Sequence, residues 1–95
     1  MAVKCRKYGV EKVFVSSVIV CKRLDHNRIL LFNKQLEEKC NENDISFINH
    51  WNIDQTHLWK DGLHLSDTGK NILARNFIFY INDFLMKCNF APGLA

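Results

Sequence analysis

The segment Val13–Val20 constrains the fold most, because it is a nearly continuous apolar run rich in β-branched residues. Such a run is typical of a strand buried on both faces in a parallel sheet. A helical pattern follows over 27–41, and a second short apolar segment follows over 45–49. The apolar stripe of that helical pattern consists of Ile29, Phe32, Leu36 and Cys40. Strand, helix and strand in this order predict a right-handed βαβ unit and therefore an α/β fold.

Both ends of the chain carry helical signals. Residues 1–8 are predicted to be the last turns of a helix that ends at Gly9 in a left-handed C-cap. Ser66 or Asp67 is predicted to cap a long final helix. Its apolar stripe comprises Ile72, Leu73, Phe77, Tyr80, Ile81, Phe84 and Leu85. A chain of 95 residues allows one small domain, and a start at the end of a helix predicts that residues 1–95 are part of a longer one.

The net charge of +3 is unevenly distributed, since residues 1–28 hold seven Lys and Arg against two acidic residues. These cations flank an apolar run and are not interleaved with aromatic residues, so we predict no nucleic-acid partner. The apolar stretch Val13–Cys21 is too short to span a bilayer and has no small-residue cleavage site after it. We therefore predict no membrane association, and the lack of a targeting segment favours the cytoplasm.

The cysteines and histidines give no clear metal motif, and we predict no cofactor. The four cysteines are widely spaced, without a C-x-x-C pair: Cys5, Cys21, Cys40 and Cys88. We interpret them as thiols in a reducing compartment, with two disulfides as the alternative.

Three histidines recur at intervals of seven, with acidic residues between them: His50, His57 and His64, with Asp54 and Asp61. Chance placement in a loop is favoured over a zinc site, because nothing in the pattern fixes the ligands.

The segment Leu58–Gly69 carries the strongest chemical signal. Asp61 and His64 are separated by two residues, one of which is Gly62, and this spacing allows a tight turn. The turn would place the carboxylate on one ring nitrogen and leave the other facing out, as a general base requires. The alternative is a capped turn in which both side chains only bond the backbone. The preceding loop over 50–65 is long, which favours a functional role, and it is apolar enough to be expected to pack against the domain.

A resemblance to a known family rests on four blocks of sequence. These are Val13–Ser17, Asn27–Ile29 with Phe32-Asn33, Ile45–Ile48, and Lys60–Leu65 with Gly69 and Leu73-Ala74. Together they resemble the C-terminal part of an SGNH (GDSL-type) hydrolase. The resemblance implies a three-layer α/β/α, flavodoxin-like fold with about five parallel strands. The last two strands and the last helix of that fold would be present here.

In that family the D-x-x-H block supplies part of a catalytic triad, so the resemblance implies His64 as general base and Asp61 as its orienting acid. The family's Gly-Asp-Ser block and its oxyanion-hole blocks are absent from this sequence. Four other residues are weak candidates for the nucleophile: Ser16, Ser17, Ser66 and Cys21.

Two hypotheses follow from this pattern. The first is the C-terminal segment of an esterase-like hydrolase, inactive alone, that acts on an ester or acyl substrate once upstream sequence completes it. The second is a non-catalytic remnant or protein-binding module of the same fold. In either case Val13–Val20 is predicted to lie at an exposed sheet edge and to promote self-association.

Overall fold

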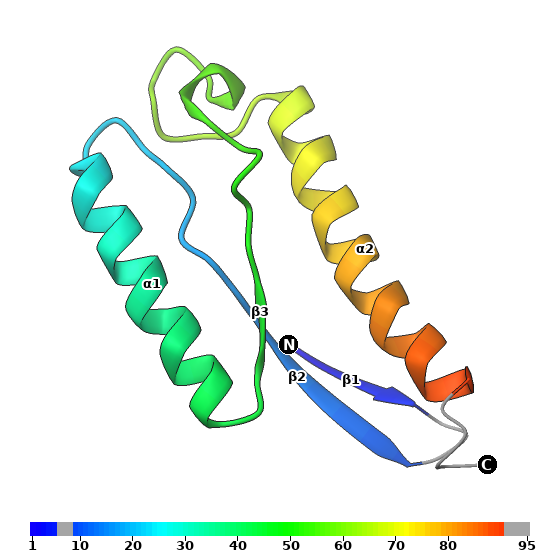
Figure 1. Cartoon of the computed structure of the whole chain (residues 1–95). Coiled ribbons are helices and arrows are strands. Elements are labelled where there is room, and N and C mark those ends of the chain that lie inside the picture. The colour runs from blue at the N-terminus through cyan, green and yellow to red at the C-terminus, as the bar shows by residue number, and fades with distance from the viewer. Residues whose placement is uncertain (6–8, 91–95) are drawn as a thin grey trace.

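The computed structural model describes residues 1–5 and 9–90, and they form a mixed sheet between two helices. The strands are β1 (Ala2–Cys5), β2 (Val10–Ser16) and β3 (Ser46–Ile48). The helices are α1 (His26–Glu42), the 3-10 turn η1 (Gln55–His57) and α2 (Asp67–Phe90). Figure 1 shows α1 and α2 on opposite sides of the strands. This arrangement confirms the predicted α/β fold and its three layers.

The sheet has the order β1-β2-β3, with β2 in the middle. β2 and β3 are parallel, with Phe14 opposite Ser46 and Ser16 opposite Ile48, and α1 connects them. The predicted βαβ succession is therefore present. Its first strand ends at Ser16, four residues earlier than the apolar run. Beyond Ser17, the side chain of Asn33 bonds both the backbone N–H and the carbonyl of Val18, at 2.7 and 2.9 Å, in place of a neighbouring strand.

The predicted N-terminal helix is wrong over the described residues, since Ala2–Cys5 is a strand antiparallel to β2. Residues 6–8 of that prediction lie outside the described residues. The N-terminal ammonium of Met1 donates to the Phe14 carbonyl at 2.9 Å, and the Phe14 N–H donates to the Met1 carbonyl at 2.6 Å. This pairing with a distant segment outweighs the weak local preference of four residues. Gly9 has the predicted positive φ, at 67°, directly before β2 instead of after a helix.

The position of β2 also corrects the predicted sheet edge. β2 has a strand on each side, so the part of the predicted edge within it, Val13–Ser16, is not an exposed edge, and the outer strands are β1 and β3. The sheet is mixed, with three strands instead of the two parallel strands expected. Self-association through a sheet edge stays a prediction, now for a different strand. The interpretation that the chain starts at the end of a helix loses its basis.

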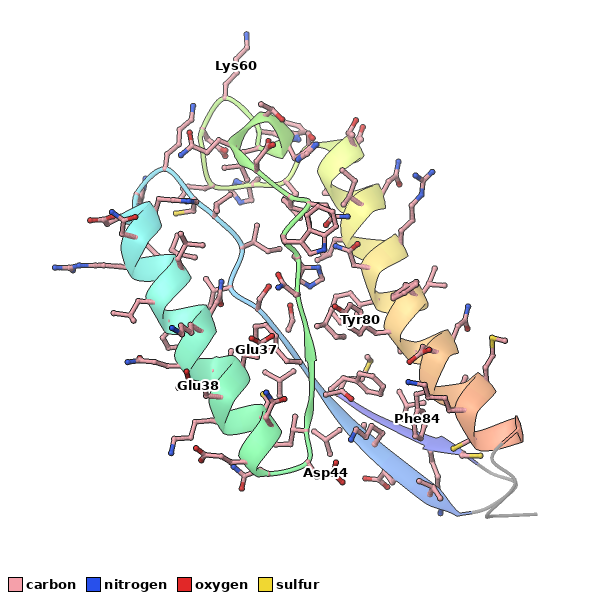
Figure 2. The ribbon with its side chains drawn as sticks, in the orientation of Figure 1. Glu37, Glu38, Asp44, Lys60, Tyr80 and Phe84 are labelled. Atoms are coloured by element: carbon pink, nitrogen blue, oxygen red, sulfur yellow. The ribbon has the colours of Figure 1, made fainter. Side chains whose placement is uncertain are left out.

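The core lies where the strands meet both helices. Ile48 is fully buried and Phe14 is 3% exposed, and the Phe14 ring meets the Phe84 ring edge-on at a centroid distance of 6.0 Å. Figure 2 shows Tyr80 and Phe84 of α2 pointing towards the strands. The seven apolar residues predicted for the α2 stripe are all half-buried.

The α1 stripe is narrower than predicted. Ile29 and Cys40 are buried and Leu36 is half-buried, whereas Phe32 is 53% exposed. Asp25 caps this helix as predicted, since its carboxylate accepts from the Asn27 N–H at 2.8 Å.

Over the described residues, no helix combines the length and apolar character needed to cross a bilayer.

Candidate functional site

Asp61 and His64 are in direct contact in the loop between η1 and α2. Asp61 Oδ2 lies 2.5 Å from His64 Nδ1, and Asp61 Oδ1 accepts from the backbone N–H groups of Leu63 and His64 at 2.9 and 3.1 Å. An ionised carboxylate only accepts, so Nδ1 carries the proton and donates it to Asp61. The His64 side chain is 76% exposed, which leaves Nε2 open to solvent. The sequence-predicted pair is therefore brought together with the expected ring orientation.

The backbone around this pair is fixed by several hydrogen bonds. The Trp59 N–H donates to the His64 carbonyl at 2.7 Å, and an antiparallel bridge joins Leu58 to Leu65. The Gly62 carbonyl accepts from the Lys22 N–H at 3.0 Å, which ties the turn to the segment after β2. Gly62 has φ +71°, a left-handed conformation that favours glycine. The turn is therefore rigidly placed although its side chains face solvent.

The start of α2 is held against the same loop. Ser66 caps the helix, because its Oγ accepts from the Gly69 N–H at 3.1 Å. Ser66 Oγ in turn donates to the His57 carbonyl at 2.9 Å. A Cβ on Gly69 would lie only 2.5 Å from the His57 carbonyl oxygen, so the lack of a side chain at Gly69 permits this close backbone approach.

The electrostatics of the pair favour an ionised Asp61. The hydrogen bond from His64, followed by the backbone hydrogen bonds from Leu63 and His64, lowers the Asp61 pKa from 3.8 to about 2. A carboxylate that stays charged at neutral pH can orient the imidazole and stabilise its cationic form. The arrangement is chemically suited to taking a proton at Nε2.

None of the weak nucleophile candidates contacts this imidazole. Ser66 Oγ is engaged as the helix cap, and Ser16 and Ser17 bond His50 instead of His64. Within residues 1–5 and 9–90, no hydroxyl or thiol is hydrogen-bonded to His64 Nε2. The described part of the chain thus holds a paired carboxylate and imidazole with no hydroxyl or thiol hydrogen-bonded to the imidazole.

Sequence reasoning missed a polar cluster around His50, which is 5% exposed. Asn76 Nδ2 donates to His50 Nδ1 at 2.9 Å, so His50 Nε2 carries the proton and donates to Ser16 Oγ at 2.8 Å. The backbone N–H of His50 also donates to Ser17 Oγ at 3.1 Å. Burial lowers the His50 pKa, which keeps the ring neutral. Nε2 already holds a proton, so His50 cannot act as a base for Ser16. Its hydrogen bonds instead connect β2, the residues after β3, and α2. The only sequence signal for this cluster was the pair of serines inside an apolar run.

The other predicted loop residues have local structural roles. Asp54 and His57 form a reciprocal capping box around η1. Of the apolar residues expected to pack, Ile53 is buried, but Trp51 is 80% exposed and Trp59 is 56% exposed. The loop is held mainly by backbone hydrogen bonds instead. No cluster of three or more metal-ligating side chains occurs in the part of the chain that the structure describes.

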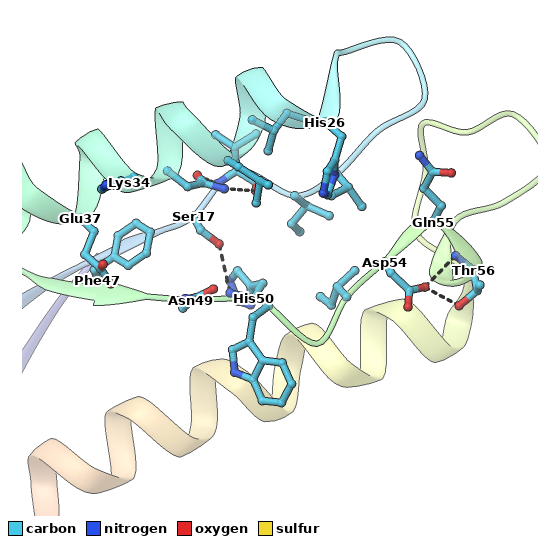
Figure 3. A pocket seen from close by; sticks show the side chains of 18 residues that line it. Ser17, His26, Lys34, Glu37, Phe47, Asn49, His50, Asp54, Gln55 and Thr56 are labelled. Atoms are coloured by element: carbon cyan, nitrogen blue, oxygen red, sulfur yellow. Dashed lines mark hydrogen bonds between the residues drawn. The ribbon is translucent and has the colours of Figure 1, made fainter.

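A cavity of about 800 Å³ lies between α1 and the segment that follows β3 (Figure 3). Its lining combines aliphatic residues, among them Val18, Ile29 and Ile53, with polar ones, and Ser17 and His50 are hydrogen-bonded to each other there. Neither Asp61 nor His64 lines this cavity. The acid–imidazole pair is therefore on the open surface, outside this cavity.

Comparison with known proteins gives one informative result. No family model matches the sequence, and no curated protein matches it. Among solved structures, the fold is similar to the crystal structure of a putative acylhydrolase from Bacteroides fragilis, with a TM-score of 0.64. The fold is acylhydrolase-like. The two sequences are 18% identical, and the similarity covers 78% of this chain. This chain spans only 43% of that protein's length, and at this identity the likeness concerns the fold alone.

Proposed function

We propose that residues 1–95 are the C-terminal segment of an SGNH (GDSL-type) esterase-like hydrolase and carry its Asp61–His64 pair. One observation carries the proposal: Asp61 Oδ2 lies 2.5 Å from His64 Nδ1, while the rest of the His64 ring faces solvent. This surface position leaves the pair without a nucleophile among the described residues and accessible to a further segment. The acylhydrolase-like fold supports the proposal, because this chain covers 43% of the similar structure and the catalytic blocks it lacks lie upstream in the family it resembles.

The proposed chemistry is acyl transfer to water. A serine hydroxyl from the upstream segment loses its proton to His64 Nε2 as its oxygen attacks the ester carbonyl. The proton then passes to the leaving alcohol, and a water molecule repeats the cycle to release the acid. Asp61 remains ionised throughout and stabilises the imidazolium, in keeping with its lowered pKa. The oxyanion donors would also come from the upstream segment.

A non-catalytic binding module is the second candidate. The observation that favours it is the lack of any described hydroxyl or thiol hydrogen-bonded to His64. In that case Asp61 would serve only as the acceptor that closes the turn. The two candidates differ in whether the Asp61 carboxylate makes His64 a better base than an ordinary surface imidazole.

The test measures hydrolysis of a short-chain aryl ester, a substrate that imidazole attacks directly and that needs no serine. The wild-type chain is compared with His64→Ala, Asp61→Asn and, as matched control, His26→Ala, since His26 is another exposed histidine. The proposal expects His64→Ala to remove most of the protein-dependent rate and Asp61→Asn to lower it at least about tenfold, because an oriented imidazole is the more effective base. Equal and small losses in the His64 and His26 variants would refute the assignment of Asp61 and His64 as an oriented acid–base pair and favour the binding module.

A further inference from the structure

Two cysteines far apart in sequence meet at one end of the molecule. Cys5 is the last residue of β1 and Cys88 lies near the end of α2. Figure 1 shows the end of β1 beside the end of α2. The two thiols are hydrogen-bonded to each other, and the two residues are only 3% and 5% exposed. A hydrogen bond between two thiols brings their sulfur atoms near each other, and such proximity is the first requirement for a disulfide.

We propose that Cys5 and Cys88 form a reversible disulfide that joins the first strand to the last helix. The other two cysteines are on different elements, since Cys40 belongs to α1 on the opposite side of the strands and Cys21 follows β2. Two thiols alone are too few ligands for a structural zinc ion. The contact therefore favours cysteine chemistry between this one pair.

The oxidant is a low-molecular-weight disulfide such as oxidised glutathione. The thiolate of one cysteine attacks a sulfur of that disulfide, which forms a mixed disulfide and releases one glutathione thiolate. The second cysteine loses its proton to solvent and attacks the protein sulfur of the mixed disulfide. This step forms the Cys5–Cys88 bond and releases the second glutathione, so two protein thiols are oxidised and one glutathione disulfide is reduced.

The environment of the pair makes this exchange slow in the folded protein. Burial, followed by the hydrogen bond and the charge interaction with Cys5, raises the Cys88 pKa above 9.0. A thiolate is therefore scarce near neutral pH, and both sulfurs are shielded from a bulky disulfide. Oxidation is expected to speed up with rising pH and with opening of the α2 end.

The bond would close a loop of 83 residue steps, from Cys5 to Cys88. Closing so long a loop restricts the unfolded chain, and the loop-entropy relation predicts an increase of up to roughly two-thousandfold in the folding equilibrium constant. The bond would strengthen the contact between β1 and α2. A redox-dependent change in stability is the expected consequence.

The experiment equilibrates the full chain by refolding it from urea in mixtures of reduced and oxidised glutathione, so that burial cannot block the reaction. Remaining thiols are alkylated and peptides are mapped by mass spectrometry. The expected result is loss of two hydrogen atoms, a Cys5–Cys88 cross-linked peptide, and a higher urea midpoint for the oxidised chain. Cys88→Ser removes the cross-link, whereas Cys21→Ser and Cys40→Ser keep it.

Two results would overturn the proposal. One is a pair that stays reduced or carries only glutathione adducts under conditions that oxidise small reference dithiols. The other is a cross-linked chain whose urea midpoint is unchanged or lower, which would mean that the folded geometry does not accept the bond. Because the mass measurement does not require a folded variant, it stays decisive even if Cys88→Ser unfolds. Neither result depends on the role of His64.

Discussion

Replacement of Gly62 by Ala tests how the acid–imidazole turn is held in place. Gly62 has φ +71°, and a Cβ there would lie 2.4 to 2.7 Å from three carbon atoms of the Lys22 side chain. One of these is Lys22 Cβ, at 2.7 Å, which cannot move without its backbone. The substitution should therefore push the two segments apart and break the hydrogen bond from the Lys22 N–H to the Gly62 carbonyl, which is 3.0 Å long.

The expected cost has two parts. An L-residue in the left-handed region costs about 1–2 kcal/mol. Loss of one backbone hydrogen bond adds about 1 kcal/mol, so Gly62→Ala should lower the free energy of unfolding by about 2–3 kcal/mol. Gly9→Ala is the matched control, because Gly9 has nearly the same φ, +67°, and a Cβ added there would meet no atom of the described residues within 4 Å. Only the cost of the left-handed conformation applies to Gly9→Ala.

The assay is urea denaturation of both variants, followed by far-ultraviolet circular dichroism. Gly62→Ala should be the more destabilised by about 1 kcal/mol. The nitrogen-15 signals of the His64 ring should also lose the pattern of a single Nδ1–H form, because the turn that holds Asp61 against the ring is displaced. Equal losses of stability in the two variants would refute the close contact between the turn and Lys22.

Three further predictions concern titration and packing. The Asp61 carboxylate stabilises the fold above the ordinary carboxyl pKa of 3.8, and this stabilisation is lost as the pH falls through about 2. A carbon-13 titration of Asp61 with a midpoint near 4 would contradict the hydrogen bonds assigned to its carboxylate. Burial lowers the His50 pKa in the folded protein, so the unfolded chain binds a proton at this ring first as the pH falls. The free energy of unfolding should therefore decrease as the pH drops below 6.5. The urea midpoint of His50→Gln should depend less on pH in that range than the wild-type midpoint does. Ile48→Ala, at a fully buried position, should cost about 2–5 kcal/mol. Phe32→Ala, at a residue that is 53% exposed, should cost less than about 1 kcal/mol, and similar losses at both sites would contradict the assigned core.

The sequence predicted the elements whose signal is local. The helix over His26–Glu42 follows from its apolar stripe and from the Asp25 cap, both of which act within a few residues. The final helix follows from seven apolar positions at helical spacing, and all seven are half-buried. The order strand, helix, strand then required β2 and β3 to be parallel, as they are.

β1 was missed because nothing within Ala2–Cys5 specifies a strand. Its conformation comes from hydrogen bonds to β2, and that pairing also turns the predicted edge strand into an inner one. The exposure of Phe32 was missed for a related reason. Periodicity identifies which residues share a helix face, but the width of the buried stripe depends on what covers it.

The contacts at the candidate site are likewise of two kinds, local ones and ones between distant parts of the chain. Asp61 and His64 are three positions apart, so their contact depends on a single turn and could be predicted from sequence. The His50 cluster joins Ser16 and Asn76, which are 34 and 26 positions away from it, and the Cys5–Cys88 contact spans nearly the whole chain. Such contacts exist only after the sheet and α2 have packed together. Local sequence therefore specifies the turn that joins Asp61 to His64 and the two long helices. Which distant polar and sulfur groups meet depends on the tertiary structure, because only packing fixes their separation.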